Sequence, residues 1–330
     1  MKLHQLGKTG PRVSAIGLGC MGMSGSYGAS DRRQAIDAIH QALDAGITLL
    51  DTGDFYGMGH NERLLAEALK GRPRDSYQLS VKFGALRGPD GSWLGFDGRP
   101  EAVKSSLAYT LDRLGTDHVD VYRPGRLDPK VPIEETVGAI KEMIEAGYVR
   151  NLGLSEVGSE TIRRAAAVHP VADLQIEYSV ITRSVEDNIL ATCRELGIAI
   201  TAYGVLSRGL LSGYYGREPA KQGDFRSHSP RFQEGNVEAN LALVEKLRAI
   251  ADARGATVAQ IAIAWVLSRG DDIFPIIGAR RPDHVAGALA ALDVTLDADD
   301  LDAIEQAVPK GAAQGDRYPT PLMASLDSER

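Results

Sequence analysis

Residues 47–83 read ITLLDTGDFYGMGHNERLLAEALKGRPRDSYQLSVKF and contain one complete strand–helix–strand pattern. The apolar run at 47–51 has the length and composition of a short buried strand. The apolar residues that follow recur at helical spacing, at Leu64, Leu65, Ala68 and Leu69. Gly71 and Pro73 end this pattern, and a second strand-like run follows at 79–83. We therefore expect two parallel strands joined by a helix.

The same alternation extends in both directions from this stretch. Six further strand-like runs occur, at 15–19, 118–122, 149–154, 173–177, 198–203 and 273–277. Helical patterns separate them, and the first of these begins after Ser30 as N-cap and ends at Gly46. Eight strands that are each followed by a helix predict an α/β fold, a parallel sheet closed into a (β/α)8 TIM barrel. An open doubly wound sheet is the alternative architecture.

Three segments lie outside the eight units, which we place at 15–292 of a single domain that spans the whole chain. Residues 1–14 are expected to form a small hairpin that closes the bottom of the barrel. A long loop at 204–236 follows the seventh strand, and an extra helix follows it at about 237–254. Residues 293–330 are expected to form a C-terminal helix and an irregular tail. Long loops and tails on such a barrel usually shape the substrate mouth.

The composition excludes several classes of protein. The 330 residues include 37 Lys and Arg against 44 Asp and Glu, and the net charge of −7 gives no general attraction to nucleic acid or to an anionic membrane. No apolar run approaches the ~18 residues that span a bilayer, and the N-terminus lacks the apolar core of a signal peptide. Two cysteines, Cys20 and Cys193, cannot build a disulfide framework, so we expect a cytoplasmic protein. Metal-ligand spacings such as H-E-x-x-H do not occur, so no metal site is expected.

Residues that can carry chemistry lie where the second and third strands end, which is the edge that holds the active site in such barrels. Asp51 ends the second strand, Tyr56 follows five residues later, and Lys82 lies near the end of the third strand. Asp51 and Lys82 are expected to pair, since neither charge is tolerated alone in an apolar barrel. An ammonium beside Tyr56 favours the phenolate and lowers the phenol pKa, which suits a general acid. A structural ion pair with a surface tyrosine is the alternative interpretation.

Several motifs, in order along the chain, resemble those of the aldo-keto reductase family. They are LLDTGDFYG at 49–57, VKFG at 81–84, GLSE at 153–156, LQIEYS at 174–179 and GVLSRG at 204–209. The resemblance extends from Leu6-Gly7 to about Leu292. It implies a (β/α)8 barrel that binds NAD(P)H across its mouth and transfers a hydride to a carbonyl.

The resemblance also implies roles for individual residues. Tyr56 would be the proton donor, Lys82 would tune it, and Asp51 would support Lys82. Tyr203, at the end of the seventh strand, would stack on the nicotinamide ring. The residues expected to bind the cofactor, with Ser155 and Gln175 on its carboxamide, are Gly22, Met23, Asp51, Ser155, Glu156, Gln175, Tyr203, Gly204, Val205, Leu206, Arg208, Gly209, Gly278, Ala279, Arg280, Arg281 and His284.

The sequence departs from the family at the end of the fourth strand. The family usually places a histidine there, in a pattern like Tyr-Gln-x-His-Arg, whereas this chain reads YRPGR at 122–126. Gly125 therefore supplies no donor to polarise a carbonyl. In one hypothesis a water replaces the imidazole and the vacated space admits a bulkier substrate. In the other, turnover is weak and the protein is a sensor or partner-binding barrel that binds NADP(H). Glu156 departs as well, because it lacks the amide donor of the Asn that is common there.

The adenosine end of the cofactor is expected after the eighth strand. Arg280 and Arg281 precede a helix that starts near Pro282, and arginines at a helix N-terminus suit a phosphate. This arrangement favours NADPH over NADH, with His284 as a weaker, pH-dependent contact. A G-x-G-x-x-G match at 17–22 is a weak signal for a Rossmann fold, because no helix opens after it.

The expected substrate contacts are Phe55, Trp93, Arg123 and Gly125. Phe96 accompanies Trp93 in a Gly-rich loop at 84–99, where an aromatic could cover the site. The guanidinium groups of Arg123 and Arg126 could bind an anionic or polyhydroxylated substrate, or they could pair with the carboxylates of Asp120 and Asp128.

We therefore expect an NADPH-dependent oxidoreductase that reduces an aldehyde or ketone, sugar-like or bulky, to an alcohol. A barrel lyase or isomerase with Lys82 as a Schiff base is less favoured, because a lysine paired with Asp51 is protonated and poorly nucleophilic. A small carbonyl compound is the partner that the sequence indicates, and an oligomer is left open.

Overall fold

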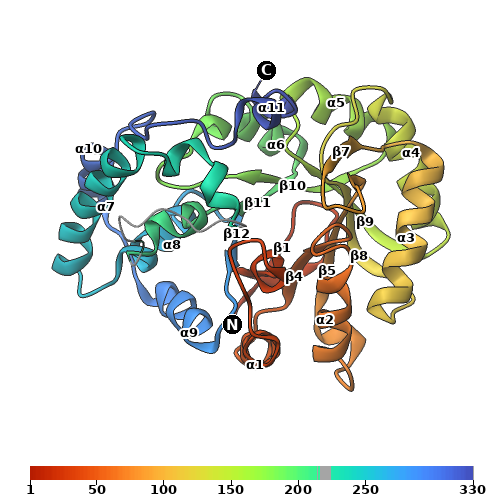
Figure 1. Ribbon diagram of the computed structural model, residues 1–330, viewed down its shortest axis with the longest axis horizontal. Helices are drawn as coiled ribbons and strands as arrows, with labels where there is room; N and C mark the ends of the chain where they lie inside the picture. The colour runs from red at the N-terminus through yellow and green to blue at the C-terminus, as the bar shows by residue number, and fades with distance from the viewer. Residues whose placement is uncertain (214, 216–223, 330) are drawn as a thin grey trace.

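The eight expected strands form one closed barrel. A computed structural model describes residues 1–213, 215 and 224–329 of the chain. The barrel strands pair in parallel and in chain order, and the last one pairs with the first (Figure 1). They are β3 (Gly17–Gly19), β4 (Leu49–Gly53), β5 (Gln78–Phe83), β8 (Val119–Pro124), β9 (Val149–Ser155), β10 (Val171–Glu177), β11 (Ala199–Tyr203) and β12 (Ile273–Gly278). The predicted (β/α)8 barrel is confirmed, and the open sheet is excluded.

Helices surround the barrel, and one of them follows each barrel strand (Figure 1). The eight that do so are α1 (Arg32–Asp44), α2 (His60–Ala68), α3 (Pro100–Leu114), α4 (Ile133–Glu145), α5 (Ser159–Val168), α6 (Ile189–Leu196), α8 (Val258–Leu267) and α9 (Pro282–Ala290). The extra helix expected after the long loop is α7 (Asn236–Ala253), and α10 (Ala298–Ala307) packs against it. The C-terminal tail after α10 is irregular apart from the short α11 (Thr320–Met323) and a 3-10 turn, Asp327–Glu329.

Capping residues fix where several of these helices begin. Asp31 caps α1, since its side chain accepts a hydrogen bond from the backbone N of Gln34 at 2.8 Å. The expected N-cap, Ser30, lies one residue too early. Thr257 forms a capping box with Gln260 at the start of α8. Capping of this kind satisfies backbone N–H groups that have no partner within the helix.

The N-terminal hairpin closes the bottom of the barrel, as predicted. Its strands β1 (Leu3–Gln5) and β2 (Arg12–Ser14) are antiparallel. Leu6 and Val13 are fully buried and pack with Leu49, Val121, Ala199, Phe274 and Ile276, which are barrel-strand residues. The backbone N of Lys8 donates to the carbonyl O of Gly197, just before β11, at 2.8 Å. The bottom of the barrel is therefore sealed by apolar side chains and backbone hydrogen bonds.

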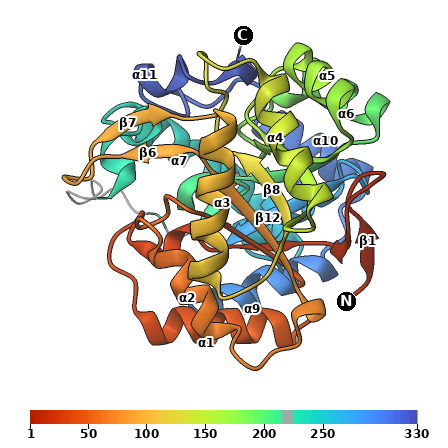
Figure 2. The same cartoon turned by 90° about the vertical axis from the view of Figure 1, so that its right-hand side faces the viewer.

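The opposite end of the barrel carries the long loops (Figure 2). The segment 84–99, expected as a Gly-rich loop, contains an antiparallel hairpin of β6 (Ala85–Arg87) and β7 (Trp93–Phe96). The Trp93 and Phe96 rings meet edge to face at 5.1 Å, and the Arg87 guanidinium lies over Trp93. Trp93 and Phe96 both belong to β7, whereas Arg87 and Trp93 are partners across the two strands, and cross-strand pairs of this kind stabilise a short hairpin.

Both cysteines are buried and unpaired: Cys20 follows β3, and Cys193 lies in α6. In the described part of the chain, no single helix is both long and apolar enough to cross a membrane. The helices α7 and α8 meet those criteria only when taken together, and they are bent by 86° where they join.

Candidate active site

A buried ion pair lies inside the barrel between neighbouring strands. Lys82 on β5 stands beside β4 because the sheet register pairs it with Gly53. The Nζ of Lys82 lies 2.7 Å from Oδ2 of Asp51, and the two side chains are 5% and 6% exposed. Ser80 Oγ donates to the other carboxylate oxygen of Asp51 at 3.1 Å. The structure therefore brings these two expected partners together.

Gln175 on β10 completes this cluster. Its Oε1 accepts a hydrogen bond from Lys82 Nζ at 2.8 Å, and its Nε2 donates to Asp51 Oδ1 at 2.7 Å. The resemblance assigns Gln175 to a nicotinamide carboxamide, but in this structure its amide binds both members of the ion pair. Three strands thus contribute to one hydrogen-bonded unit.

Tyr56 lies in the loop after β4, directly beside the ion pair. Its backbone N donates to Gly53 O at 3.0 Å, which turns the chain back over the strand end. The Lys82 ammonium lies 5.2 Å from the centroid of the Tyr56 ring, and the tyrosine is 8% exposed. Asn61, which the sequence did not single out, holds this loop: its amide accepts from Thr52 Oγ1 and donates to Cys20 O and Ser24 Oγ, at 2.6–2.8 Å.

Burial controls the acidity of this site more than the local charges do. It raises the pKa of the Tyr56 phenol well above its usual value, and the Asp51 carboxylate raises it further. The expected lowering of the Tyr56 pKa by Lys82 is therefore not what the structure shows. Burial also lowers the pKa of Lys82, while Asp51 opposes that shift. Tyr56 is a neutral phenol, which is the form that can donate a proton.

The Phe55 ring lies against Gly125, the position at which the resemblance implies that the usual histidine is missing. A Cβ placed on Gly125 would lie 3.2 Å from the Phe55 ring and 3.2 Å from Phe83 O. The Phe55 ring also contacts the place of a Cβ on Gly53, at 3.3 Å, and meets Tyr56 edge to face at 4.9 Å. The Phe55 ring therefore lies against the position of a Gly125 side chain, and the hypothesis of a vacated space for a bulkier substrate stays a prediction.

Arg123 lies deeper in the barrel than a substrate contact would. Its side chain is fully buried, and its Nη2 donates to both carboxylate oxygens of Asp173, at 2.8 and 2.9 Å. Asp120, offered as its partner by the sequence, instead pairs with Arg74 at 2.7 Å. Arg126 does reach the mouth, where its Nη1 lies 3.4 Å from Ser155 Oγ. The assignment of Arg123 to the substrate is corrected, since the barrel walls enclose its guanidinium.

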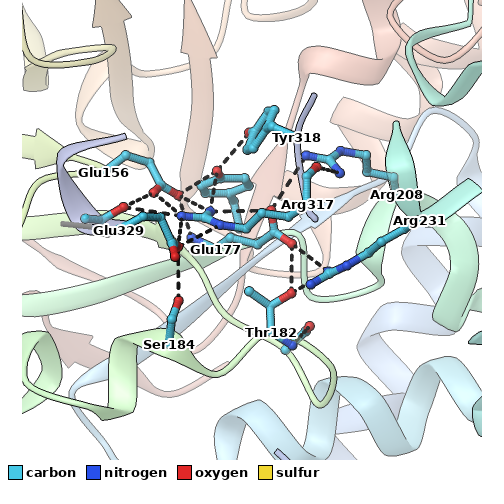
Figure 3. Close-up of polar contacts among 12 residues, drawn as sticks. Glu156, Glu177, Thr182, Ser184, Arg208, Arg231, Arg317, Tyr318 and Glu329 are labelled. Atoms are coloured by element: carbon cyan, nitrogen blue, oxygen red, sulfur yellow. Dashed lines mark hydrogen bonds and ion pairs between the residues drawn. The ribbon is translucent and has the colours of Figure 1, made fainter. Parts of the chain in front are cut away.

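Glu156 holds the C-terminal tail instead of presenting a free carboxylate (Figure 3). Arg317 donates to both of its oxygens, at 2.7 and 2.6 Å, and Ser328 Oγ donates to Oε2 at 2.6 Å. Glu156 and Arg317 are 0% and 3% exposed, and Glu329 pairs with the same guanidinium at 2.7 Å. Although burial favours the protonated acid, Arg317 holds the pKa of Glu156 well below its usual range.

A second buried acid, Glu177, lies within the same network (Figure 3). Arg231 pairs with its Oε1 at 3.3 Å, while Arg317 and Arg208 lie 3.6 and 3.7 Å from its Oε2. Thr182 Oγ1 donates to Oε1 at 2.9 Å. The sequence did not single out Glu177, Arg231 and the tail residues as a group, because they come from three separate segments.

The tail delivers Tyr318 to the residues expected around a nicotinamide. The hydroxyls of Tyr318 and Tyr203 are 2.9 Å apart, and Arg126 Nη2 donates to Tyr318 at 3.2 Å. The Tyr203 hydroxyl also donates to Glu156 at 2.6 Å. The Arg208 guanidinium lies over the Tyr318 ring at 4.5 Å. The tail is thus part of the barrel mouth.

The turn after β11 is strained. Gly204, Ser207, Arg208 and Gly209 all have positive φ, and two of them are not glycine. Such conformations cost about 1–3 kcal/mol for each residue other than glycine, here Ser207 and Arg208, and concentrate at functional sites. Ser207 Oγ is buried and has no hydrogen-bond partner among the described residues. Of the other residues expected there, Val205 is buried and Leu206 is partly exposed.

The end of β12 leads into α9 as expected. Gly278 is exposed and Ala279 is buried, and Arg280 Nη1 donates to the carbonyl O of Tyr27 at 3.0 Å. Arg281 forms an exposed ion pair with Asp283. Partial burial lowers the pKa of His284, as does Arg281, so this histidine carries little charge at neutral pH.

The loops after β3 and β11 meet across the mouth. The backbone N of Phe225 donates to Ser26 O at 3.2 Å. Gly22 lies in the 3-10 turn after β3 and is partly exposed, whereas the Met23 side chain is buried beneath that turn. Trp93 is 39% exposed on the β6–β7 hairpin. Among the described residues, no group of three or more His, Cys, Asp or Glu could hold a metal ion.

The chain is similar to known proteins over most of its length. A profile described as "Aldo/keto reductase family" matches residues 15–309. A Glycine max protein named "Probable aldo-keto reductase 1" is 42% identical over 317 residues, which cover 95% of this chain and 91% of that protein.

Solved structures give the same indication. The glycerol dehydrogenase of Gluconobacter oxydans has a TM-score of 0.83 at 29% identity, over 92% of this chain and 94% of that one. An aldo-keto reductase from Klebsiella pneumoniae, solved in complex with NADPH, has a TM-score of 0.75 at 25% identity, over 97% and 99% of the two chains.

Proposed function

The chain belongs to the aldo/keto reductase family, and from this premise we propose that it is an NADPH-dependent reductase that converts an aldehyde or ketone to an alcohol. The single observation that carries the proposal is the hydrogen-bonded unit of Asp51, Lys82 and Gln175 directly beside Tyr56. This unit holds an acid and a cation at the edge of the barrel where such enzymes react their substrates.

Tyr56 is the proposed proton donor. A phenol with a raised pKa is still a much stronger acid than an alcohol, so it can protonate the alkoxide that forms when the carbonyl is reduced. The Lys82 ammonium, held by Asp51, then stabilises the phenolate that remains on Tyr56. Tyr56 regains its proton from solvent before the next turnover.

Phe55 replaces the imidazole sterically but supplies no hydrogen-bond donor. We propose that carbonyl polarisation falls to a water or to the Arg126 guanidinium, whose Nη1 lies 2.6 Å from Gly125 O. A guanidinium keeps its charge at every physiological pH, unlike a histidine.

The residues of the mouth fit a dinucleotide. In the strained turn 204–209, Ser207 Oγ is a buried polar atom without a partner among the described residues, and a bound anion would accept its hydrogen bond. Arg280 and the N-terminus of α9 would hold the 2′-phosphate, which favours NADPH over NADH. Ser155, Gln175 and Tyr203 would hold the nicotinamide. The bound cofactor supplies the hydride, and its complex with the Klebsiella pneumoniae relative supports this choice.

The test compares wild type with Tyr56→Phe on a panel of aldehydes, ketones and sugars, with NADPH and with NADH, at the nicotinamide absorbance. We expect the variant to lose about 100-fold or more in kcat, the usual contribution of a general acid, with little change in cofactor affinity. Tyr109→Phe is the matched control, because Tyr109 is 63% exposed and belongs to α3.

The second candidate is an NADP(H)-binding sensor, which the missing histidine at Gly125 favours. It predicts cofactor binding with equal, near-zero rates for wild type and Tyr56→Phe over the whole panel. A Schiff-base lyase is less favoured, because Lys82 is paired with Asp51 at 2.7 Å and is therefore a poor nucleophile. Borohydride trapping of a substrate on Lys82 would support it.

A further inference from the structure

A second buried ion pair lies beside the Asp51–Lys82 pair. Arg123 on β8 and Asp173 on β10 are both fully buried, and they interact through two hydrogen bonds of 2.8 and 2.9 Å. Thr201 Oγ1 on β11 donates to Asp173 Oδ2 at 2.6 Å. Burying two charges is costly unless their geometry is fixed, so this pair needs a reason beyond packing.

Neighbouring strands are shaped around the Arg123 side chain. A Cβ on Gly153 of β9 would lie 2.7 Å from Arg123 Nε and 2.7 Å from Asp173 Oδ1. Real Cβ atoms do not make contacts this short, so any larger residue at position 153 would displace the pair. The barrel therefore reserves space for a guanidinium at this depth.

The pair approaches the proposed catalytic unit through Nη1 of Arg123. Arg123 Nη1 lies 3.8 Å from Asp51 Oδ1, and neither Nη1 nor Nε has a hydrogen-bond partner among the described residues. Asp51 thus stands between two cations, Lys82 at 2.7 Å and Arg123 at 3.8 Å. A carboxylate shared in this way binds each cation less tightly than it would bind either alone.

We propose that Arg123, held in place by Asp173, is a positioning residue that sets how strongly Asp51 binds the Lys82 ammonium. The inference rests on the proposed reductase function, in which that ammonium stabilises the Tyr56 phenolate. Arg123 touches neither substrate nor cofactor in this role; it acts through Asp51.

The electrostatics of Lys82 agree with this geometry. Burial lowers the pKa of Lys82, Asp51 raises it, and Arg123 lowers it again. Asp173, whose own pKa is raised by burial, neutralises part of the Arg123 charge. The titratable or charged groups that face Lys82 from the surrounding elements are Asp51 and Tyr56 from β4 and its loop, Arg123 and Arg126 from β8 and its loop, Asp173 from β10, and Cys20 after β3.

Two variants move the Lys82 pKa in opposite directions. Asp173→Asn keeps the shape but leaves the Arg123 charge without its counter-ion, so Lys82 loses its proton more easily. The double variant Arg123→Met/Asp173→Asn removes both charges and leaves Asp51 to Lys82 alone, so the ammonium is held more tightly. Turnover needs the ammonium, so kcat should fall on the alkaline side of its pH profile as Lys82 loses its proton. The pH of this fall should be lower in Asp173→Asn and higher in the double variant, each by about one pH unit.

The pKa of Lys82 can also be measured without turnover. We would titrate the Lys82 13Cε resonance in 13C-lysine-labelled protein, assigned by its loss in Lys82→Arg. Arg163→Met is the control, because Arg163 forms an exposed ion pair with Glu195 and should shift neither readout. Thermal unfolding of each variant establishes that it is folded.

Opposite shifts of the Lys82 resonance support the proposal. The proposal is overturned if the Lys82 pKa is unchanged in both variants or moves in the same direction in both. A purely structural pair would lower the stability of the variants without moving the Lys82 pKa in opposite directions. If the resonance shifts as expected but wild type reduces nothing, the reductase function fails and the coupling stands. If wild type turns over but the resonance does not move, the coupling fails and the reductase function stands.

Discussion

The two ends of the barrel are closed by terminal segments of opposite character. At the bottom, the hairpin of β1 and β2 inserts Leu6 and Val13 into an apolar cluster and bonds through its backbone. At the mouth, the tail inserts Arg317 between Glu156 and Glu177, and Tyr318 beside Tyr203. The closure at the bottom is apolar and does not depend on charged side chains. The closure at the mouth is made mainly of ion pairs.

This difference separates stability from chemistry within one fold. The apolar closure at the bottom can stay tightly packed, because no ligand has to pass through that end of the barrel. A closure built from buried charges next to the proposed cofactor site is strong only while each charge keeps its partner. The following experiments test whether the two closures differ in this way.

The largest effect is expected from Arg317→Met. It leaves the Glu156 carboxylate buried without a cation, and breaking such a pair typically costs about 3–5 kcal/mol. We expect the tail to detach locally, with hydrogen exchange in 311–329 faster by more than about 100-fold and the β1–β2 hairpin unaffected. The exposed pair of Arg281 and Asp283 supplies the control: Arg281→Met should leave exchange in the tail unchanged. Equal exchange in both variants would contradict the charged closure.

The next effect is expected from Gly7→Ala in the hairpin. Gly7 has φ +63°, and a Cβ there would clash with the carbonyl oxygen of Ala172. We expect the free energy of unfolding in urea to fall by about 3 kcal/mol, with an unchanged KM for NADPH. Gly115→Ala isolates the clash, because Gly115 has φ +64° and open space around its Cβ position. A large change in KM would show that the bottom closure also influences the mouth.

Acid should loosen the tail selectively. The folded pKa of Glu156 is well below its usual range, so its contribution to stability is complete above the unfolded pKa near 4.3. That contribution is lost as pH falls towards the folded pKa, by about 2 kcal/mol at pH 3. Hydrogen exchange of 311–329, corrected for the intrinsic rate at each pH, measures the loss. A tail that is equally protected at pH 7 and pH 3 would be inconsistent with a charged Glu156.

The smallest effect is expected from Tyr318→Phe. The variant removes hydroxyl contacts with Tyr203 and Arg126 but keeps the ring under Arg208. We expect the Kd for NADPH to change by about fivefold, since each such hydrogen bond contributes about 1 kcal/mol. Fluorescence titration with NADPH measures it, and Tyr148→Phe, at a 49%-exposed tyrosine, is the control. An unchanged Kd would mean that the tail closes the mouth without contacting the cofactor.

The sequence predicts the barrel well because its signals are local. Each strand is predicted from an apolar run of five or six residues, and each helix has its own periodicity and ends, so units such as 47–83 are recognisable without any long-range information. The exception at α1 is small: Asp31 caps the helix in place of Ser30, since both residue types suit that position. Asp51 and Lys82 were also predictable as partners, because adjacent parallel strands bring their ends together.

The missed contacts are those that join distant segments. Glu156 and Arg317 are 161 residues apart, and the tail has no periodicity that would aim its arginine at the mouth. Asp120, offered as an alternative partner of Arg123, is near it in sequence, but residues 120 and 123 face opposite sides of a strand. Strand alternation alone would have placed Arg123 inside the barrel with Asp173.

Phe55 illustrates a different limit. The family resemblance implies that the usual histidine is absent at Gly125, but it does not indicate which side chain lies against that position. The structure places the Phe55 ring against both Gly53 and Gly125, so the lack of a side chain at these two positions makes room for the ring. The effect of burial on Tyr56 was missed for the same reason, since the depth of a side chain is a property of the closed barrel.

The reactivity of the two buried cysteine thiols can report when the barrel opens. Cys20 and Cys193 are fully enclosed, and burial raises the pKa of Cys193 to about 12 and that of Cys20 further. Alkylating reagents attack the thiolate, so the native protein should be inert to them at neutral pH. Labelling at Cys193 would time the release of α6, and labelling at Cys20 would time the opening of the first strand's loop. Pulsed alkylation read by mass spectrometry could therefore follow the order in which the wall of the barrel comes apart.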